Sequence, residues 1–190
     1  MQIKKLMLLL ISINQIINIS SIKSSEKNNP RIISLNSLGA DIVSKLDNSS
    51  LVGIPGSSLL KKNKKLQDKV VISSGRMPPS IEKIIALKPD LVIGSKGFHD
   101  KVLSKLNQLN IRTLETETKS IKNLENLIEK LSKTLNKDKN ILLTELNHCY
   151  KLPSKTKGTA VVLASTKPLL SPNSQSWAGS LLDRFKFNNI

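Results

Sequence analysis

The chain has 190 residues, enough for one ordinary domain but few for two complete lobes, since domains cluster near about 100–150 residues. Its 30 Lys and Arg outnumber 14 Asp and Glu, giving a net charge of +16, which favours anionic partners. Only 3% of the residues are aromatic and the lysines are not interleaved with them, so we expect no nucleic-acid binding by base stacking.

The first 25 residues are typical of a signal peptide. Lys4 and Lys5 precede a short apolar run, Leu6 to Ile13, which is shorter than the roughly 20 residues of a membrane-spanning helix. Small residues for cleavage are only loosely placed, as at Ser24 and Ser25. We therefore predict export to the periplasm, with an uncleaved anchor as the alternative.

Alternating strands and helices follow from residue 31. We expect strands near Ile32–Leu35 and Leu51–Ile54, with a helix at Leu38–Leu46 between them. Helices between strands indicate an α/β fold, a parallel sheet flanked by helices on both faces.

The segment Val70 to Gly94 predicts a loop, a helix, a turn and a buried strand. Ser80 is a good cap for a helix at Ile81–Leu87, and Pro89 ends that helix. The strand Leu91–Ile93 comes next, and its carboxyl end is a place where ligands bind in open α/β sheets.

The remaining pattern continues to the end of the chain. We expect a helix near His99–Leu109, a strand at Arg112–Leu114 and an amphipathic helix from Ile121 to Leu135 behind a Ser120 cap. Apolar spacing then continues to Tyr150, which predicts a long helix ending before Pro153; an ordinary surface helix fits equally well. The last predicted elements are a strand at Ala160–Ala164, a polar loop at Ser165–Gly179 and a helix at Ser180–Phe185.

Three pieces of this pattern resemble the periplasmic substrate-binding proteins of ABC importers for iron siderophores, haem and cobalamin, in the class with a helical hinge. They are RIISLNSLGADIVSKL from Arg31, LVGI from Leu51 and SIEKIIALKPDLVIG from Ser80. The resemblance implies an N-terminal lobe at 26–136, a linking helix at 137–157 and the start of a second lobe at 158–190, after the signal peptide at 1–25. It also implies that the second lobe is truncated, as in a split protein or a gene remnant.

The resemblance and the strand ends together predict where ligand binds. The candidate ligand-binding residues are Asn36, Ser37, Gly56, Ser57, Ser58, Ser74, Gly75, Arg76, Met77, Ser95, Lys96 and Gly97 in the first lobe, with Ser165 and Trp177 in the second. Arg76 is the sharpest candidate because a guanidinium grips a carboxylate bidentately; a plain surface arginine is as good an interpretation. Trp177 suits a flat ligand, and a core position suits it slightly better.

The same resemblance places Glu82 where relatives dock on their membrane permease, although Glu82 also stabilises the first turn of its helix. Relatives in single-membrane bacteria often carry a lipid on a cysteine, and no cysteine lies near the N-terminal segment.

No enzyme motif is present, so we expect no catalysis, no cofactor and no metal site. The two histidines, His99 and His148, lack metal-ligand spacing. His99 could coordinate a metal of the ligand from the loop after Gly97, but we expect it to be solvated. Cys149, the single cysteine, excludes an internal disulfide and is expected in the core.

The sequence thus predicts a monomeric solute-binding protein that passes a small metal chelate, a ferric siderophore, haem or cobalamin, to an ABC permease. One alternative is an exported basic protein that binds anionic polymers or membrane surfaces through charge. A nonfunctional remnant is the other.

Overall fold

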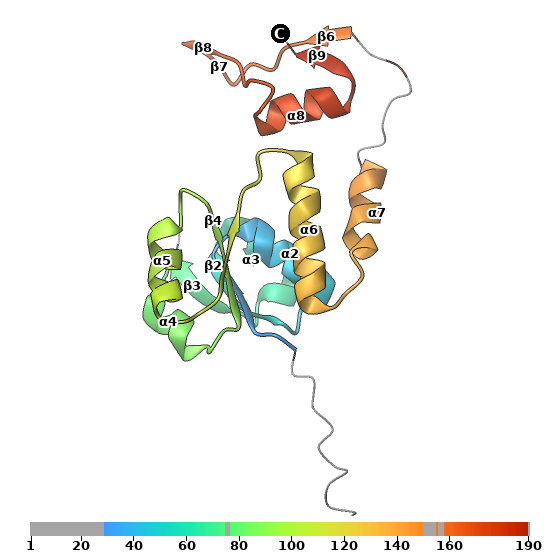
Figure 1. The fold of residues 1–190 in the computed structure, drawn as a ribbon. Coiled ribbons are helices and arrows are strands. Elements are labelled where there is room, and N and C mark those ends of the chain that lie inside the picture. The colour runs from blue at the N-terminus through green and yellow to red at the C-terminus, as the bar shows by residue number, and fades with distance from the viewer. Residues whose placement is uncertain (1–28, 75–76, 150–154, 156–157, 190) are drawn as a thin grey trace, which may run out of the picture.

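The computed structural model describes residues 29–74, 77–149, 155 and 158–189. Its centre is a parallel sheet of five strands in the order β3-β2-β1-β4-β5 (Figure 1). The strands are β1 Ile32–Ser34, β2 Leu51–Gly56, β3 Val70–Ser74, β4 Leu91–Ser95 and β5 Thr113–Thr116. All neighbouring pairs are parallel, so the carboxyl ends share one edge of the sheet. The predicted α/β fold class is confirmed.

Helices cover both faces of this sheet (Figure 1). They are α2 Ser37–Asp47, α3 Ser58–Lys61, α4 Ile81–Ala86, α5 Asp100–Gln108, α6 Ile121–Leu135 and α7 Asn140–Cys149, with a 3-10 helix at Lys64–Leu66. Residues of α2, α6 and α7 form one apolar cluster with the sheet, and α4 and α5 form another on the opposite face. The central strands are buried from both sides, which is why Ile32, Ile33 and Val92 are fully inaccessible to solvent.

The chain path puts a topological switch point beside β1. The chain moves outward from β1 to β2 and β3, then returns to β4 on the other side of β1. Helices that leave β1 and β4 consequently go to opposite faces of the sheet. This divergence opens a crevice at the carboxyl ends of the strands.

Short polar caps begin the helices, as their sequences predict. The side chains of Asn36, Ser80 and Ser120 each accept a hydrogen bond from a backbone N–H of the first turn of α2, α4 and α6. Lys88 has a left-handed φ of 46° just after α4 and leads the chain through Pro89 into β4. These caps fix the residue at which α2, α4 and α6 each begin.

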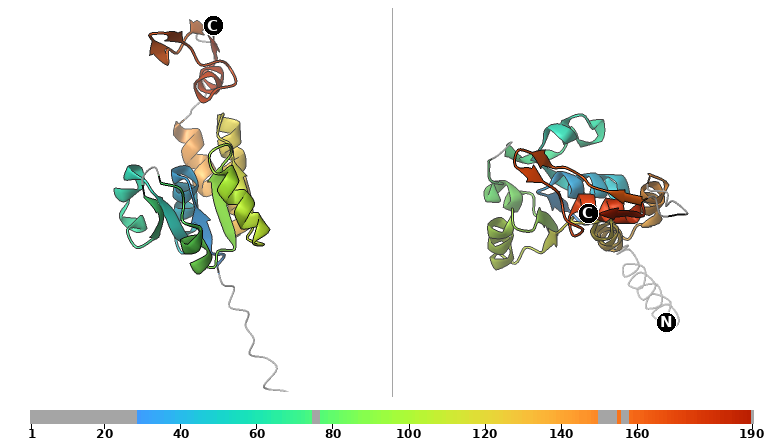
Figure 2. Two further views of the ribbon diagram at one scale, coloured as in Figure 1. Left: turned by 90° about the vertical axis from the view of Figure 1, so that its left-hand side faces the viewer. Right: turned by 90° about the horizontal axis from the view of Figure 1, so that it is seen from above.

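The C-terminal part contains β6 Gly158–Ala160, β7 Ser165–Thr166, β8 Leu169–Leu170, α8 Trp177–Arg184 and β9 Phe187–Asn189. β6 and β9 pair in parallel, and β7 and β8 pair antiparallel. This part lies beyond the carboxyl edge of the five-stranded sheet in two orthogonal views (Figures 1 and 2). An ion pair of 3.1 Å between Arg184 Nη1 and Glu125 Oε1 joins α8 to α6.

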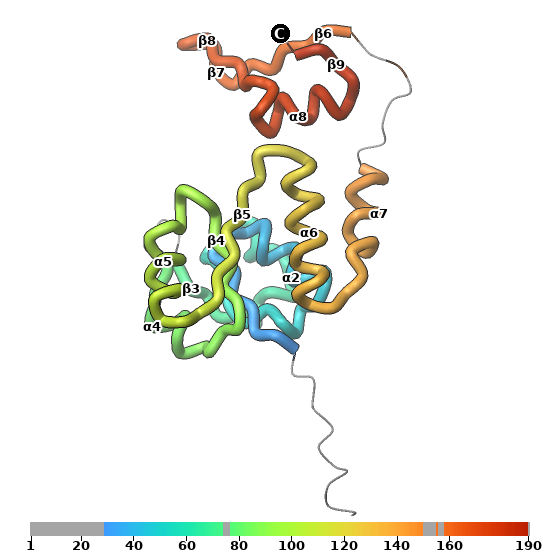
Figure 3. Tube along the Cα trace, viewed as in Figure 1, coloured from blue at the N-terminus to red at the C-terminus, as the bar shows by residue number. Residues whose placement is uncertain are grey.

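Two expected elements differ in the five-stranded part. Val70–Ser74 was expected as a loop and is an edge strand, β3, because it pairs with β2. The linking helix expected at 137–157 corresponds to α7, which begins only at Asn140, after Asn136 has ended α6 with a left-handed φ of 52°. α7 then runs antiparallel beside α6 (Figure 3) and packs Leu142 into the core of the first lobe, so it is not a free linker.

Further corrections concern the C-terminal elements and the cysteine. The strand expected at Ala160–Ala164 lies earlier, at β6, and the loop expected at Ser165–Gly179 contains β7, β8 and the start of α8. Cys149 is exposed because it lies at the end of α7, so its expected core position is wrong. Tyr150 and Pro153 lie outside the described residues. Within the described ranges, every helix is too short or too polar to cross a membrane.

Candidate functional site

A cavity of about 880 Å³ opens at the carboxyl ends of β1, β2 and β4, at the switch point of the sheet. Its walls are formed by the loops that follow β1, β2, β3 and β4, together with residues of α2, α3 and α5. The lining residues are Leu35, Asn36, Ser37, Pro55, Gly56, Ser57, Ser58, Lys61, Ser73, Met77, Pro78, Pro79, Ser95, Phe98, His99, Lys101 and Val102. Its volume lies within the range of about 300–1,000 Å³ typical of small-molecule sites. We call this space the edge cavity.

The structure brings together seven of the predicted ligand-binding residues. Those that line the edge cavity are Asn36, Ser37, Gly56, Ser57, Ser58, Met77 and Ser95. Lys96 and Gly97 follow β4 without lining it. Ser74 ends β3, and Gly75 and Arg76 lie outside the described residues. Ser165 and Trp177 belong to β7 and α8, neither of which contributes a wall residue.

Asn36 has a structural task at the cavity wall. Its Oδ1 accepts a 2.7 Å hydrogen bond from Gly39 N, and its Nδ2 donates to Ser95 Oγ at 3.1 Å and Thr116 Oγ1 at 3.0 Å. Thr116 Oγ1 in turn donates to the Gly94 carbonyl. Asn36 therefore connects the start of α2 to the ends of β4 and β5, and its side chain is already committed to protein partners.

Sequence reasoning missed four notable wall residues, Lys61, Phe98, His99 and Lys101. They come from the end of α3 and from the loop and first turn that lead into α5. Phe98 is 82% exposed, and Met77, which comes from the loop before α4, is 66% exposed. An aromatic side chain in a polar loop directly after a buried strand was the signal available in the sequence.

His99 is buried, with 5% of its surface exposed, so the expectation that it is solvated is wrong. The Ser95 backbone N–H donates to His99 Nδ1 over 2.9 Å, and the ring meets Phe98 edge-to-face at 4.8 Å between centroids. Burial lowers the pKa of His99, although the negative charge of Asp100 opposes this effect. His99 is thus neutral at pH 7, with its proton on Nε2 because Nδ1 is an acceptor.

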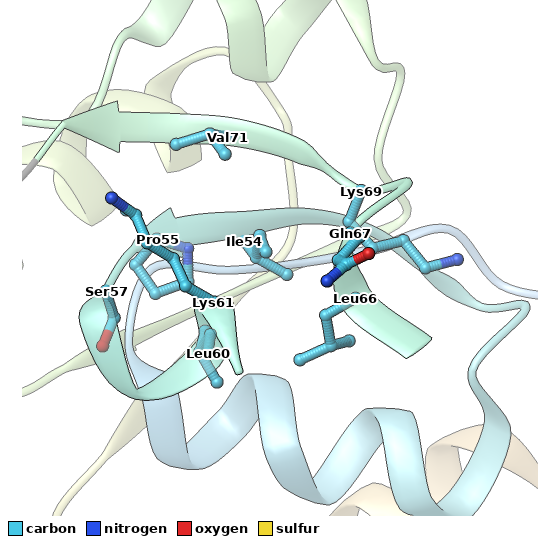
Figure 4. Close-up of a pocket in the computed structure, with 10 residues that line it drawn as sticks. Ile54, Pro55, Ser57, Leu60, Lys61, Leu66, Gln67, Lys69 and Val71 are labelled. Carbon is cyan, nitrogen blue, oxygen red and sulfur yellow. The ribbon is translucent and has the colours of Figure 1, made fainter. Parts of the chain in front are cut away.

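A second, smaller cavity of about 340 Å³ adjoins the first (Figure 4). It lies beside β2 and β3, between these strands and the turn formed by α3 and the 3-10 helix, and Ile54, Leu60 and Leu66 give it an apolar floor. Pro55 and Lys61 belong to the walls of both cavities. The smaller cavity thus continues the edge cavity towards the outer strand.

Glu82 lies on the surface at the start of α4. Hydrogen bonds from its own backbone N–H and from the Ser80 hydroxyl, at 3.0 Å from Oε2, lower the pKa of Glu82. Glu82 is not among the residues that line the edge cavity. Its charge is available to an external cationic partner.

The arrangement offers binding groups rather than reactive ones. Among the described residues, no three His, Cys, Asp or Glu side chains gather as a metal site would require. The edge cavity presents hydroxyls, two lysines, one neutral imidazole and several apolar side chains. Such a wall suits a solute with both polar and apolar parts.

A sequence model of the family described as periplasmic binding protein matches residues 32–190. No curated protein matches the sequence significantly. The match spans both the five-stranded part and the C-terminal part of the chain.

Solved structures share this fold. An ABC transporter substrate-binding protein from Listeria monocytogenes has 24% identity and a TM-score of 0.66 over 85% of this chain and 64% of that one. A possible iron-binding, periplasmic solute-binding protein from Staphylococcus epidermidis has 20% identity and a TM-score of 0.69 over 86% and 67%. The periplasmic vitamin B12 binding protein of Vibrio cholerae has 23% identity and a TM-score of 0.59 over 85% and 66%. The present chain thus spans 64–67% of the length of these structures.

Proposed function

We propose that this chain, which belongs to the periplasmic binding protein family, binds a small metal chelate in its edge cavity and delivers it to the permease of an ABC importer. The family is one of binding proteins, so the chain is not an enzyme.

The observation that carries the proposal is the position of the edge cavity. It lies at the carboxyl ends of the strands on both sides of the switch point, where open α/β sheets bind ligands. The C-terminal part lies beyond the same edge (Figure 2).

The proposed solute is an iron complex, either a ferric siderophore or haem, or else cobalamin. The similar protein from Staphylococcus epidermidis is described as iron-binding and that from Vibrio cholerae as binding vitamin B12. Both kinds of solute are metal chelates with large organic frames. The volume of the edge cavity and its mixture of hydroxyl and apolar groups support a solute of this kind.

We further propose that the chain works outside the cytoplasm as a monomer and meets its permease through Glu82. The family description supports a periplasmic location. Glu82 supports docking because its side chain is exposed and the lowered pKa of its carboxyl group keeps it ionised. An arginine or lysine on the permease would complement it.

A binding titration tests this function. The chain from residue 26 onward is titrated with haem, a ferric siderophore and cyanocobalamin at low and high salt, and the melting temperature is recorded. A saturable rise with one solute, little changed by salt, is the expected result. Heparin serves as the polyanion control, because a rise with heparin that disappears at high salt would support the charge-driven alternative instead.

A further inference from the structure

The charged side chains that line the edge cavity are all positive among the described residues. Lys61 and Lys101 line it, and none of its described wall residues is acidic. No carboxylate of the described residues lies within ion-pairing distance of either ammonium group. The cavity therefore presents two positive charges that the described part of the protein does not neutralise.

The two lysines approach from opposite sides of β1. Lys61 ends α3, after β2, and Lys101 is in the first turn of α5, after β4. β2 and β4 are the two neighbours of β1, so the strands that carry these lysines are about 10 Å apart. Two flexible ammonium groups that line one cavity from these two sides can contact two separate anionic groups of one solute.

His99 adds a directed hydrogen-bond donor to this wall. Its Nδ1 is used by Ser95 N–H, which leaves Nε2–H, and no described protein group accepts a hydrogen bond from it. A protonated Nε2 has no lone pair to offer a metal ion. His99 can therefore donate to an oxygen atom of a solute, but it cannot ligate the metal in this tautomer.

Exposed apolar groups complete the wall. Phe98 and Met77 are 82% and 66% exposed, although both line the cavity. Binding is favoured when a flat or apolar surface of the solute covers exposed side chains of this size, because apolar area is removed from water.

We infer that the solute of the edge cavity is a net anionic chelate with an apolar or aromatic face. Its anionic oxygens lie between Lys61 and Lys101, one oxygen accepts from His99 Nε2–H, and the apolar face covers Phe98 and Met77. This inference rests on the proposed function. Within that function it favours carboxylate- or catecholate-bearing chelates over uncharged hydroxamate chelates and cobalamin.

Two ferric probes that differ in charge test the inference. Dissociation constants are measured by equilibrium dialysis for an anionic ferric tris-catecholate and an uncharged ferric trihydroxamate, with haem and cyanocobalamin beside them. We expect the tris-catecholate to bind at least about tenfold more tightly than the trihydroxamate. Replacing both lysines, as Lys61→Gln with Lys101→Gln, should weaken tris-catecholate binding by about tenfold or more and leave trihydroxamate binding nearly unchanged.

A control with the same net charge is available on α6. Lys122→Gln with Lys133→Gln removes two positive charges from exposed positions outside the cavity wall, and we expect less than about a twofold change. Equal effects of the two lysine pairs would overturn the inference, because they would assign the preference to overall charge.

His99 is tested with two substitutions that divide its roles. His99→Asn keeps an acceptor near the Nδ1 position for Ser95 N–H but lacks the distant donor, whereas His99→Gln keeps a donor near the Nε2 position. We expect His99→Asn to weaken tris-catecholate binding about fivefold or more and His99→Gln to weaken it less. Unchanged binding by His99→Asn would remove His99 from the proposed contact.

The outcomes separate this inference from the proposed function. If the uncharged trihydroxamate or cyanocobalamin binds as tightly as the tris-catecholate, regardless of Lys61 and Lys101, the anionic class is wrong and solute binding stands. If none of the four probes binds to the folded chain, the proposed function fails and the inference fails with it.

Discussion

The side-chain amide of Asn36 donates a hydrogen bond to the Thr116 hydroxyl over 3.0 Å, across a sequence separation of 80 residues. The same amide nitrogen donates to Ser95, and the amide oxygen caps α2. One side chain thus fixes the relative positions of a helix start and two strand ends. Because these segments form part of the wall of the edge cavity, its shape depends on this residue.

We expect Asn36→Ala to lower the free energy of unfolding by about 2 kcal/mol. The loss combines a helix cap, worth about 1 kcal/mol, with hydrogen bonds to the Ser95 and Thr116 hydroxyls. Urea unfolding measures it. Ser120→Ala is the matched control because Ser120 caps α6 without crossing the sheet, and about 1 kcal/mol is expected there. Equal losses in the two variants would mean that the contacts across the sheet contribute nothing.

Replacing Gly39 by alanine tests how closely α2 packs on the sheet, through the sign of the change in the free energy of unfolding. Alanine inside a helix normally stabilises relative to glycine by about 0.5–1 kcal/mol. Here a Cβ on residue 39 would lie 2.6 Å from Ser34 Oγ and 3.0 Å from Ile93 Cγ2, so Gly39→Ala should destabilise by about 1–3 kcal/mol. Thermal unfolding provides the measurement. A stabilised Gly39→Ala variant would contradict the close packing of α2 on β1 and β4.

A double-mutant cycle identifies the contact responsible. Ser34→Ala removes the nearest oxygen, so it should relieve part of the Gly39→Ala penalty after its own cost is subtracted. Strict additivity of the two effects would assign the penalty to other neighbours, such as Ile93.

The first lobe was predictable where local signals and tertiary packing agree. Ser80 and Pro89 fix the limits of α4 and introduce β4 through chemistry that acts within a few residues. β3 was missed for the opposite reason. Val70 and Val71 are exposed at the sheet edge, 42% and 45%, and become a strand only by pairing with β2, a partner that local sequence does not specify.

The break between α6 and α7 shows a second limit. Apolar spacing continues past Asn136 because both helices bury an apolar face against the same core, so periodicity alone does not mark where α6 ends and α7 begins. The signal for the break is Asn136 itself, since asparagine tolerates the left-handed conformation that ends a helix.

The edge cavity lies at the edge of the sheet where the sequence places the candidate site, but several of its wall residues are not predicted. Strand order places loops such as those at Ser57 and Ser95 on the cavity wall from topology alone. Lys61, His99 and Lys101 reach the wall from helix ends, and their contribution depends on how α3 and α5 pack. Packing angles of this kind are not encoded in a short sequence window.

The contact between Glu125 and Arg184 predicts how firmly α8 is held. Arg184 donates to Glu125 Oε1 and to Asn147 Oδ1, both at 3.1 Å, and so joins α8 to α6 and α7. Glu125→Gln should weaken this attachment by about 1 kcal/mol, since the pair is only partly buried. Hydrogen exchange is expected to speed up in α8 and to stay unchanged in the five-stranded sheet.

Glu129→Gln is the matched control for this change. Glu129 is on the same helix and pairs with Lys133 and Lys139, away from α8. Exchange in α8 should be unaffected. If Glu125→Gln instead accelerates exchange evenly through α6 and the sheet, the ion pair stabilises the first lobe as a whole rather than the attachment of α8.

His99 predicts a dependence of stability on pH. Burial lowers its pKa in the folded protein below the ordinary value of 6.5, so the unfolded chain binds the proton more readily. The stability that neutral, buried His99 contributes is therefore fully present above pH 6.5, and it is lost as the pH falls towards the pKa of His99 in the folded protein. Denaturant midpoints measured from about pH 8 to about pH 5 should decrease for the unmodified chain, since carboxylates titrate mostly below this range.

His99→Asn keeps the acceptor for Ser95 N–H but cannot titrate, so its midpoint should change less over the same interval. Parallel curves for the two proteins would show that other groups cause the dependence, and that His99 is charged or solvated in the folded state.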